Sequence, residues 1–71
     1  MKEVNISTEY ITLGQFLKLA DIIQSGGEAK LFLLERDIIV NGEIDSRRGR
    51  KLRDGDVIVV DNNEYVVRRC F

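Results

Sequence analysis

The sequence predicts an α+β domain in which a tight pair of helices precedes a small, mainly antiparallel sheet. Apolar residues recur at helical spacing in the first half of the chain, whereas short β-branched runs separated by turn dipeptides fill the second half. No proline-rich linker, low-complexity tract or internal repeat divides the 71 residues. We therefore expect residues 1–71 to form a single domain of two layers.

The first elements are a short strand and a helix. Val4 and Ile6 alternate with polar residues, which predicts a short N-terminal strand. The segment ITLGQFLKLADIIQ, residues 11–24, predicts the first helix, because its apolar residues share one helical face. These are Leu13, Phe16, Leu17, Ala20 and Ile23. Thr12 and Gln15 have the spacing of a capping box, so we expect the helix to begin there.

A second helix is predicted by QSGGEAKLFLLERD, residues 24–37. Ser25 has the position of its N-cap and Glu28 that of the capping-box partner. The inward face is expected to hold Ala29, Phe32 and Leu33. Because almost nothing separates the two helical patterns except a turn softened by Gly26 and Gly27, we expect the helices to form a compact pair.

The remaining elements are strands. Ile38–Val40 is a β-branched run followed by Asn41-Gly42, the dipeptide most typical of a two-residue hairpin turn. Residues 57–60 and 65–67 predict two further strands, joined by a turn at residues 61–63. Apart from the N-terminal strand, we expect the helices to come first and the sheet second.

The composition argues against several classes of function. The chain has no histidine and one cysteine, Cys70, so it lacks the usual general base and the ligands of a cysteine-rich zinc site. We expect no enzymatic activity, no metal and no cofactor. Asp54-Gly55-Asp56 is interpreted as turn chemistry rather than an acid-base pair. The apolar runs are too short to span a bilayer and no signal segment begins the chain, so we expect a cytoplasmic protein without membrane contact.

The segment SRRGRKLRDGD, residues 46–56, concentrates positive charge in a chain whose net charge is −1. Five of the 11 basic residues lie there, namely Arg47, Arg48, Arg50, Lys51 and Arg53. Cations this close repel one another unless a polyanion or salt compensates. Arginine is well suited to bidentate phosphate contacts and to stacking on bases. The loop therefore predicts nucleic-acid binding, with a solvated loop as the alternative. Arg68 and Arg69 either extend this patch or form a solvated end.

A second candidate anion site lies at the start of the second helix. Free backbone N–H groups and the helix dipole attract anions, and glycines such as Gly26 and Gly27 permit close approach. The alternative is that Ser25 and these glycines form a plain cap and tight turn. Lys18 and Lys30 would add positive charge nearby. Together these residues predict a basic groove.

Residues 12–60 resemble the RNA-binding domain named after ribosomal protein S4. In that family Leu-x-x-Phe-Leu and Ser-x-x-Glu-Ala lead into Val-Asn-Gly and then Gly-Asp-x-Ile-x-Val. The matching residues here are Leu13, Phe16, Leu17, Ser25, Glu28, Ala29, Val40, Asn41, Gly42, Gly55, Asp56, Ile58 and Val60. The chain is especially similar to small stand-alone bacterial proteins of the YaaA type, with which it shares LGQFLKLA, QSGG and RRGRKL.

The resemblance implies an S4-like fold that binds structured ribosomal or transfer RNA through the two helices and the following loop. Its candidate RNA-binding residues here are Lys18, Ser25, Gly26, Gly27, Lys30, Asn41, Arg47, Arg48, Arg50, Lys51 and Arg53. Many members open the first helix with Arg-Leu-Asp and have a basic residue after the serine. This chain has Thr12, Gly14 and Gly26 at those positions, which shifts the expected binding toward residues 47–51.

We therefore expect a monomeric, non-enzymatic protein that binds RNA or a ribosomal subunit during ribosome assembly or translation. One rival interpretation is a protein-interaction adaptor that uses exposed apolar residues such as Leu31 or Phe71 and the acidic flanks of the chain. Another is a DNA-binding accessory protein, because contacts to phosphate alone do not distinguish DNA from RNA.

Overall fold

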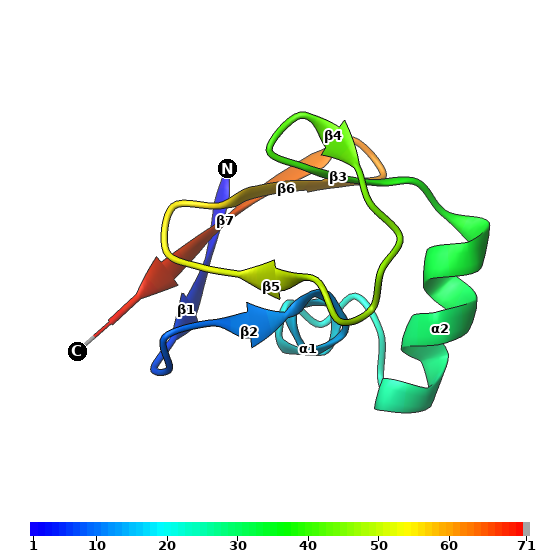
Figure 1. Cartoon of the computed structure of the whole chain (residues 1–71), viewed down its shortest axis with the longest axis horizontal. Helices are drawn as coiled ribbons and strands as arrows, with labels where there is room; N and C mark the ends of the chain where they lie inside the picture. The colour runs from blue at the N-terminus through cyan, green and yellow to red at the C-terminus, as the bar shows by residue number, and fades with distance from the viewer. Residues whose placement is uncertain (71) are drawn as a thin grey trace.

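The computed structural model describes residues 1–70, which form two helices and seven strands (Figure 1). In chain order these are β1 (Lys2–Ile6), β2 (Ile11–Thr12), α1 (Leu13–Leu19), α2 (Gly26–Glu35), β3 (Ile38–Val40), β4 (Glu43–Ile44), β5 (Lys51–Leu52), β6 (Val57–Val60) and β7 (Asn63–Arg69). The predicted α+β class is confirmed.

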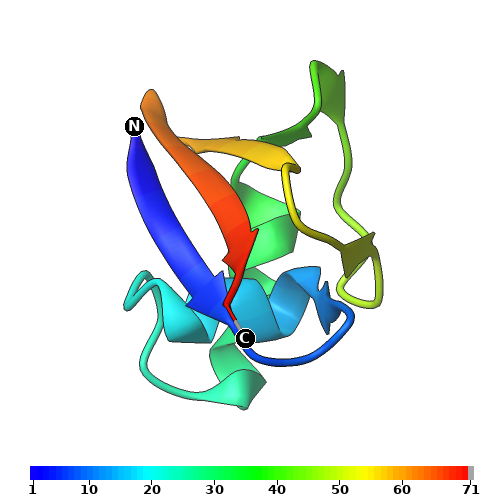
Figure 2. The same cartoon turned by 90° about the vertical axis from the view of Figure 1, so that its left-hand side faces the viewer.

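Five strands form the main sheet in the order β1-β7-β6-β3-β4, and β2 and β5 form a separate two-stranded ribbon. All pairs are antiparallel except β1 with β7, in which Val4 lies beside Val67. Figure 2 shows β1 and β7 running side by side in the same direction. The N-terminal strand and the mainly antiparallel sheet are confirmed. The expectation that the sheet follows the helices is incomplete, because β1 joins the last strand of the chain.

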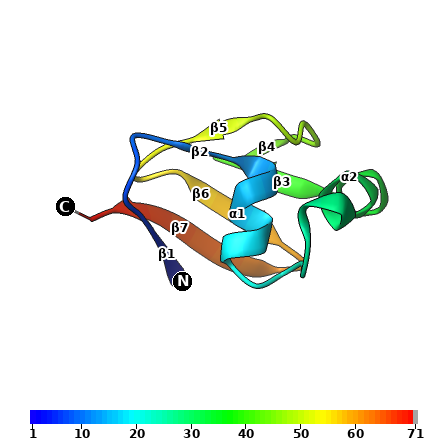
Figure 3. The same ribbon diagram turned by 90° about the horizontal axis from the view of Figure 1, so that it is seen from below.

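The core lies between the sheet and α1, which crosses one face of the sheet in Figure 3. Leu13, Phe16 and Leu17 of α1 are fully buried. Phe16 packs edge-on against Tyr65 of β7, with ring centroids 5.6 Å apart. Burial of each large apolar side chain contributes about 1.5–3 kcal/mol to folding, so this helical face fixes α1 on the sheet.

The first helix is shorter than predicted. It ends at Leu19 instead of continuing toward residue 24, because Asp21 adopts a left-handed conformation with φ of 62°. The N–H groups of Asp21 and Ile22 donate to the carbonyls of Lys18 and Leu17, the bonding pattern of a Schellman motif. Ile23 is still buried, but a turn rather than the helix places it in the core. Residues 20–25 therefore form a longer connection than expected.

The two predicted capping boxes have different outcomes. At α1 the box is confirmed: Gln15 N donates to Thr12 Oγ1 over 3.2 Å, and Thr12 N donates to Gln15 Oε1 over 2.9 Å. At α2 the box is wrong, although Ser25 is the N-cap. Its hydroxyl donates to the Glu28 carboxylate over 3.5 Å and makes no bond to the helix backbone. Gly26 and Gly27 lie in the first turn of α2 rather than in the connection.

The predicted turns are confirmed. Asn41 and Gly42 both have positive φ, at 50° and 86°, and join β3 directly to β4. Asp61 and Asn62, also with positive φ, form the turn between β6 and β7, whereas Asn63, which was expected in this turn, begins β7. One strand in the second half of the chain was not predicted. This strand, β5, lies within the basic segment and pairs with β2.

Candidate nucleic-acid interface

The basic loop, defined as residues 46–53, passes over the start of α1 and beside α2 (Figure 1). Leu13 N donates to the carbonyl of Arg50 over 2.7 Å, and Gly14 N donates to the carbonyl of Arg48 over 3.0 Å. These bonds satisfy backbone N–H groups that a helix cannot satisfy by itself at its first turn. The loop is therefore held on α1 by its own backbone, and its side chains are displayed around the helix pair.

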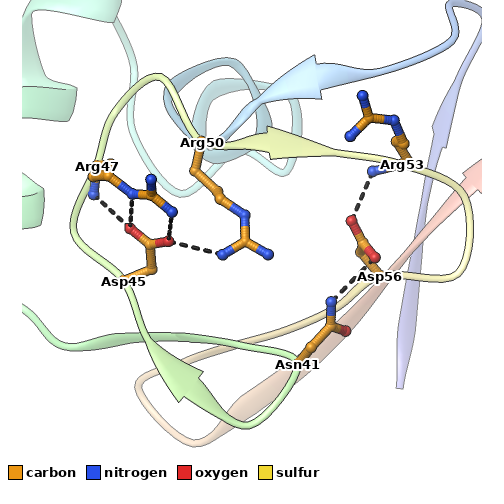
Figure 4. A network of polar contacts seen from close by, with 6 residues as sticks. All are labelled: Asn41, Asp45, Arg47, Arg50, Arg53 and Asp56. Carbon is orange, nitrogen blue, oxygen red and sulfur yellow. Dashed lines mark hydrogen bonds and ion pairs between the residues drawn. The ribbon is translucent and has the colours of Figure 1, made fainter.

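Asp45 anchors the beginning of the basic loop (Figure 4). It is only 9% exposed, and its carboxylate accepts bonds from two arginines. Arg47 donates from its backbone N over 2.9 Å, from Nε over 3.1 Å and from Nη2 over 2.8 Å, while Arg50 donates from Nη1 over 2.8 Å. The two side-chain bonds from Arg47 form the bidentate arrangement in which a guanidinium binds a carboxylate best.

This network fixes the charge of Asp45. The hydrogen bond from the Arg47 side chain is the main reason that the pKa of Asp45 lies well below its usual range, although burial alone would raise that pKa. Asp45 in turn raises the pKa of Arg47. The Arg47 side chain remains 73% exposed and that of Arg50 27% exposed. Both arginines are thus oriented by a buried carboxylate, and Arg47 still presents most of its surface to solvent.

Arg48 is positioned by a close approach to α1. A Cβ atom added at Gly14 would lie 2.7 Å from Cγ of Arg48, so only glycine leaves room for the arginine stem at this point. Next to the stem opens a groove of about 420 Å³ between α1, the start of α2 and the loop. Its lining residues are Thr12, Gly14, Gln15, Lys18, Gly26, Ala29, Arg48 and Gly49. Three predicted binding residues, Lys18, Gly26 and Arg48, therefore share one groove.

The other predicted cations line two neighbouring hollows instead of this groove. Lys30 lines a second hollow together with Ser46 and Arg48, so Arg48 lies between the two hollows. A third hollow, on the basic loop itself, is lined by Arg47, Gly49, Arg50, Lys51, Arg53 and Asp56. Because Arg48 lines the first two hollows and Gly49 lines the first and the third, the three hollows adjoin along the basic loop.

Asn41 has a role inside the fold. Its Nδ2 donates to Asp56 Oδ1 over 3.1 Å, and its Oδ1 accepts from the N–H of Val57 over 2.9 Å. Asp56 also accepts from the backbone N of Arg53 over 2.8 Å (Figure 4). These bonds tie the β3–β4 turn to the connection before β6, and they agree with the interpretation of Asp56 as turn chemistry.

Ser25 and Gly27 are exposed at the start of α2, as an anion site there requires. However, Ser25 Oγ is directed at Glu28, whose carboxylate adds negative charge to the same turn. Phosphate binding at this helix end therefore has a competitor that the sequence pattern did not reveal.

Arg68 and Arg69 both belong to β7. Arg68 forms an ion pair with Glu3 over 3.5 Å, and the backbone N of Arg69 donates to Asp54. Leu31 is 60% exposed, as the adaptor interpretation requires, whereas Phe71 lies outside the described residues.

Neither helix in the described part of the chain is long and apolar enough to cross a membrane. Within residues 1–70, no group of three acidic, cysteine or histidine side chains is placed to hold a metal ion.

Comparison with known proteins agrees with the motif pattern. The family model of the S4 domain matches residues 4–68, which extends the resemblance from residues 12–60 to include strands at both ends of the chain. A protein of Bacillus subtilis (strain 168) described as "Probable ribosome maturation protein RlbA" is 64% identical over 58 residues, which cover 82% of each of the two chains. The fold, the order of the motifs and the family match lead to one conclusion: this chain belongs to the S4 domain family.

Proposed function

We propose that this chain is a monomeric, non-enzymatic RNA-binding domain that binds structured ribosomal RNA, or a ribosomal particle, during ribosome assembly. The observation that carries the proposal is the shared groove of Lys18 and Arg48 between the two helices and the basic loop. The S4 domain match and the 64% identity to a relative described as a ribosome maturation protein support the same function. We expect a protein with such a role to be cytoplasmic.

The groove suits a phosphate backbone. Lys18 and Arg48 supply positive charge on two of its sides, and Gly26 presents a surface without a side chain. The groove is open, and besides these two cations it has few polar side chains that could recognise particular chemical groups. It therefore fits a ligand that is recognised by shape and charge. Double-stranded RNA is recognised mainly in that way.

Asp45 makes the basic loop a better partner for RNA than its charge alone predicts. A flexible loop loses conformational entropy when it binds RNA, whereas this loop is already held by the bonds of Arg47 and Arg50 to the Asp45 carboxylate. The carboxylate also offsets part of the repulsion within the loop in the absence of RNA. The loop therefore keeps its shape before the ligand arrives.

The test is cosedimentation with ribosomal particles over a range of salt concentrations. The site variant is Lys18→Gln/Arg48→Gln/Lys51→Gln, which leaves the bonds of Asp45 intact. The matched control is Lys2→Gln/Arg36→Gln/Arg68→Gln, which removes the same charge from other parts of the chain. We expect the site variant to lose association and the control to retain it. For the wild type, affinity should fall with salt by about 0.7–0.9 log units per log unit of salt for each phosphate contact.

Two results would change the proposal. Equal loss in both variants would indicate unspecific charge attraction rather than this groove. Failure of the wild-type protein to sediment with particles or to enrich any RNA would refute the proposed function. Competition with duplex RNA, duplex DNA and single strands separates RNA binding from the DNA-binding alternative.

The adaptor function is the second candidate, and exposed leucines on α2 favour it. Leu31 and Leu34 are 60% and 75% exposed and lie three residues apart on the helix. A protein partner that covers them would bind with little dependence on salt. Substitution of both leucines by serine should abolish such binding and leave the sedimentation assay unchanged.

A further inference from the structure

The ribbon of β2 and β5 has an inner and an outer face. Ile11 pairs with Leu52 and Thr12 pairs with Lys51. Ile11 and Leu52 are buried in the core. Because successive side chains of a strand point to opposite faces, Thr12 and Lys51 lie on the outer face. Continuing the register by one residue places Tyr10 across from Arg53 on this same face.

Tyr10 is an aromatic residue that the core does not use. The residue is 39% exposed, and it is absent from the buried cluster to which Phe16 and Tyr65 belong. Lys51 Nζ lies 4.9 Å from the centroid of the Tyr10 ring, and Arg53 Cζ lies 5.6 Å from it. Both distances are typical of cation–π contacts. The turn before β2 is fixed by Thr8, whose Oγ1 donates to the carbonyl of Tyr10 over 2.7 Å.

An exposed ring beside two cations has the composition of a base-stacking site. Unpaired bases of RNA stack on aromatic side chains and on guanidinium planes, while lysine and arginine bind the adjoining phosphates. Beside the ring lies a hollow lined by Thr8, Glu9, Tyr10, Ile11, Thr12 and Gln15. Thr12 and Gln15 also line the groove that holds Arg48, so the two depressions adjoin.

We propose that the outer face of the β2–β5 ribbon binds an unpaired nucleotide of the RNA, with Tyr10 stacking on the base and Lys51 and Arg53 binding its phosphates. The inference rests on the proposed RNA-binding function and specifies its substrate class. The helical part of the RNA lies along the groove of Lys18 and Arg48, and the unpaired nucleotide extends onto the ribbon. The preferred ligand is then a helix next to a bulge, loop or junction.

Tyrosine fluorescence offers a direct probe of this contact. The chain has two tyrosines and no tryptophan, and Tyr65 is buried against Phe16. In a Tyr65→Phe background, Tyr10 is the only tyrosine. We expect an RNA hairpin with one bulged nucleotide to quench its emission, and the fully paired hairpin of the same stem to quench it much less.

Binding measurements with the same two RNAs complete the test. Tyr10→Leu should weaken binding of the bulged hairpin by about 5- to 150-fold, the effect of losing one stacked base, and leave the paired hairpin unchanged. Tyr10→Phe keeps the ring and should bind like the wild type. The double variant Lys51→Gln/Arg53→Gln should weaken binding of the bulged hairpin more than binding of the paired hairpin, because it removes the contacts to the phosphates of the unpaired nucleotide. Thermal unfolding of each variant confirms that it is folded.

Two outcomes would overturn the inference. If the wild type binds both RNAs and Tyr10→Leu changes neither, or changes both equally, then Tyr10 does not stack on a base and the RNA-binding function stands without it. If the wild type binds neither of these RNAs nor ribosomal particles, the proposed function fails together with the inference.

Discussion

Arg47 and Arg50 share one buried carboxylate, whereas Arg48 and Lys51, in the same loop, form no ion pair within the described residues 1–70. The four side chains carry the same charge and lie within a few positions of one another. Their surroundings nevertheless divide them into two groups. Arg47 and Arg50 hold the loop in shape through Asp45, and Arg48 and Lys51 are available to a ligand. Charge density alone therefore does not identify the residues that bind RNA, and substitutions should separate loss of stability from loss of binding.

The largest effect is expected at Asp45, because it serves both arginines of the first group. Asp45→Ala removes four hydrogen bonds and leaves Arg47 and Arg50 without their partner. Net bonds to charged groups contribute about 1.5–3 kcal/mol each at most, and the exposure of Arg47 lowers their value, so we expect a loss of about 2 kcal/mol. For a domain of this size, the midpoint of thermal unfolding should be about 8–16 °C lower.

Glu43→Gln is the matched control for that change, because Glu43 is an exposed carboxylate close to Asp45 in sequence. It should leave the unfolding temperature almost unaltered. If Asp45→Ala also unfolds at the wild-type temperature, the loop does not depend on its carboxylate and the distinction between the two groups is lost.

The next largest effect is a contrast between two substitutions, because Arg48→Gln should affect RNA binding and Arg50→Gln should affect stability. Arg48→Gln should weaken RNA binding by about tenfold, reduce the salt slope by about 1, and leave stability unchanged. Arg50→Gln should lower stability by about 1 kcal/mol, because it removes one bond to a buried carboxylate. Titration of RNA at several salt concentrations and thermal unfolding of both variants give the comparison. Equal effects of the two variants in both assays would contradict it.

A smaller effect is expected from Gly14→Ala, which changes the contact between α1 and Arg48 at the helix instead of at the arginine. The new methyl group would collide with Cγ of Arg48 and displace its stem from α1. Stability should change little, because alanine favours the helix by up to about 1 kcal/mol over glycine and offsets part of the strain. RNA binding should fall by a few-fold, and Arg48→Gln in the same background should add little. Additive losses would show that Gly14 and Arg48 act separately.

The sequence predicted most of the features that depend on neighbouring residues, although the capping box expected at Ser25 and Glu28 does not form. The capping box of Thr12 and Gln15 and the Asn41-Gly42 turn are local bonding patterns, and both are present. The end of α1 was missed, because the left-handed residue that stops the helix is Asp21 rather than the glycine that usually signals a stop. The ribbon of β2 and β5 was also missed. Two residues per strand give no periodicity, and only the three-dimensional fold brings them together.

The candidate site was predictable in its charge and not in its organisation. The five cations of the basic loop are evident from the sequence, whereas only the structure shows that Arg48 alone among them shares a groove with Lys18. Asp45 gave one signal, a single acid directly before the basic run, but its burial depends on how the loop returns across α1. Tyr10 gave none, because its position beside Lys51 arises from pairing between segments about forty residues apart.

The smallest effect is expected from pH, and it tests whether Asp45 is as firmly paired as its contacts indicate. The pKa of Asp45 is held below its usual range, so between that lowered pKa and about 3.9 the unfolded chain binds more protons than the folded one. Its contribution to stability is therefore complete above about pH 5 and is lost progressively as the pH falls through the folded pKa. At pH 3.5 the chain should have lost less than about 1 kcal/mol of the stability that Asp45 contributes.

Urea unfolding of the wild type and of Asp45→Asn between pH 3 and 7 isolates this group from the other carboxylates, because only the difference between the two proteins reports on residue 45. The difference in the free energy of unfolding between the wild type and Asp45→Asn should stay constant from pH 5 to 7 and become smaller below pH 4. A difference that does not vary with pH would mean that the pKa of Asp45 is the same in the folded and unfolded chains, and therefore that its negative charge does not hold the loop.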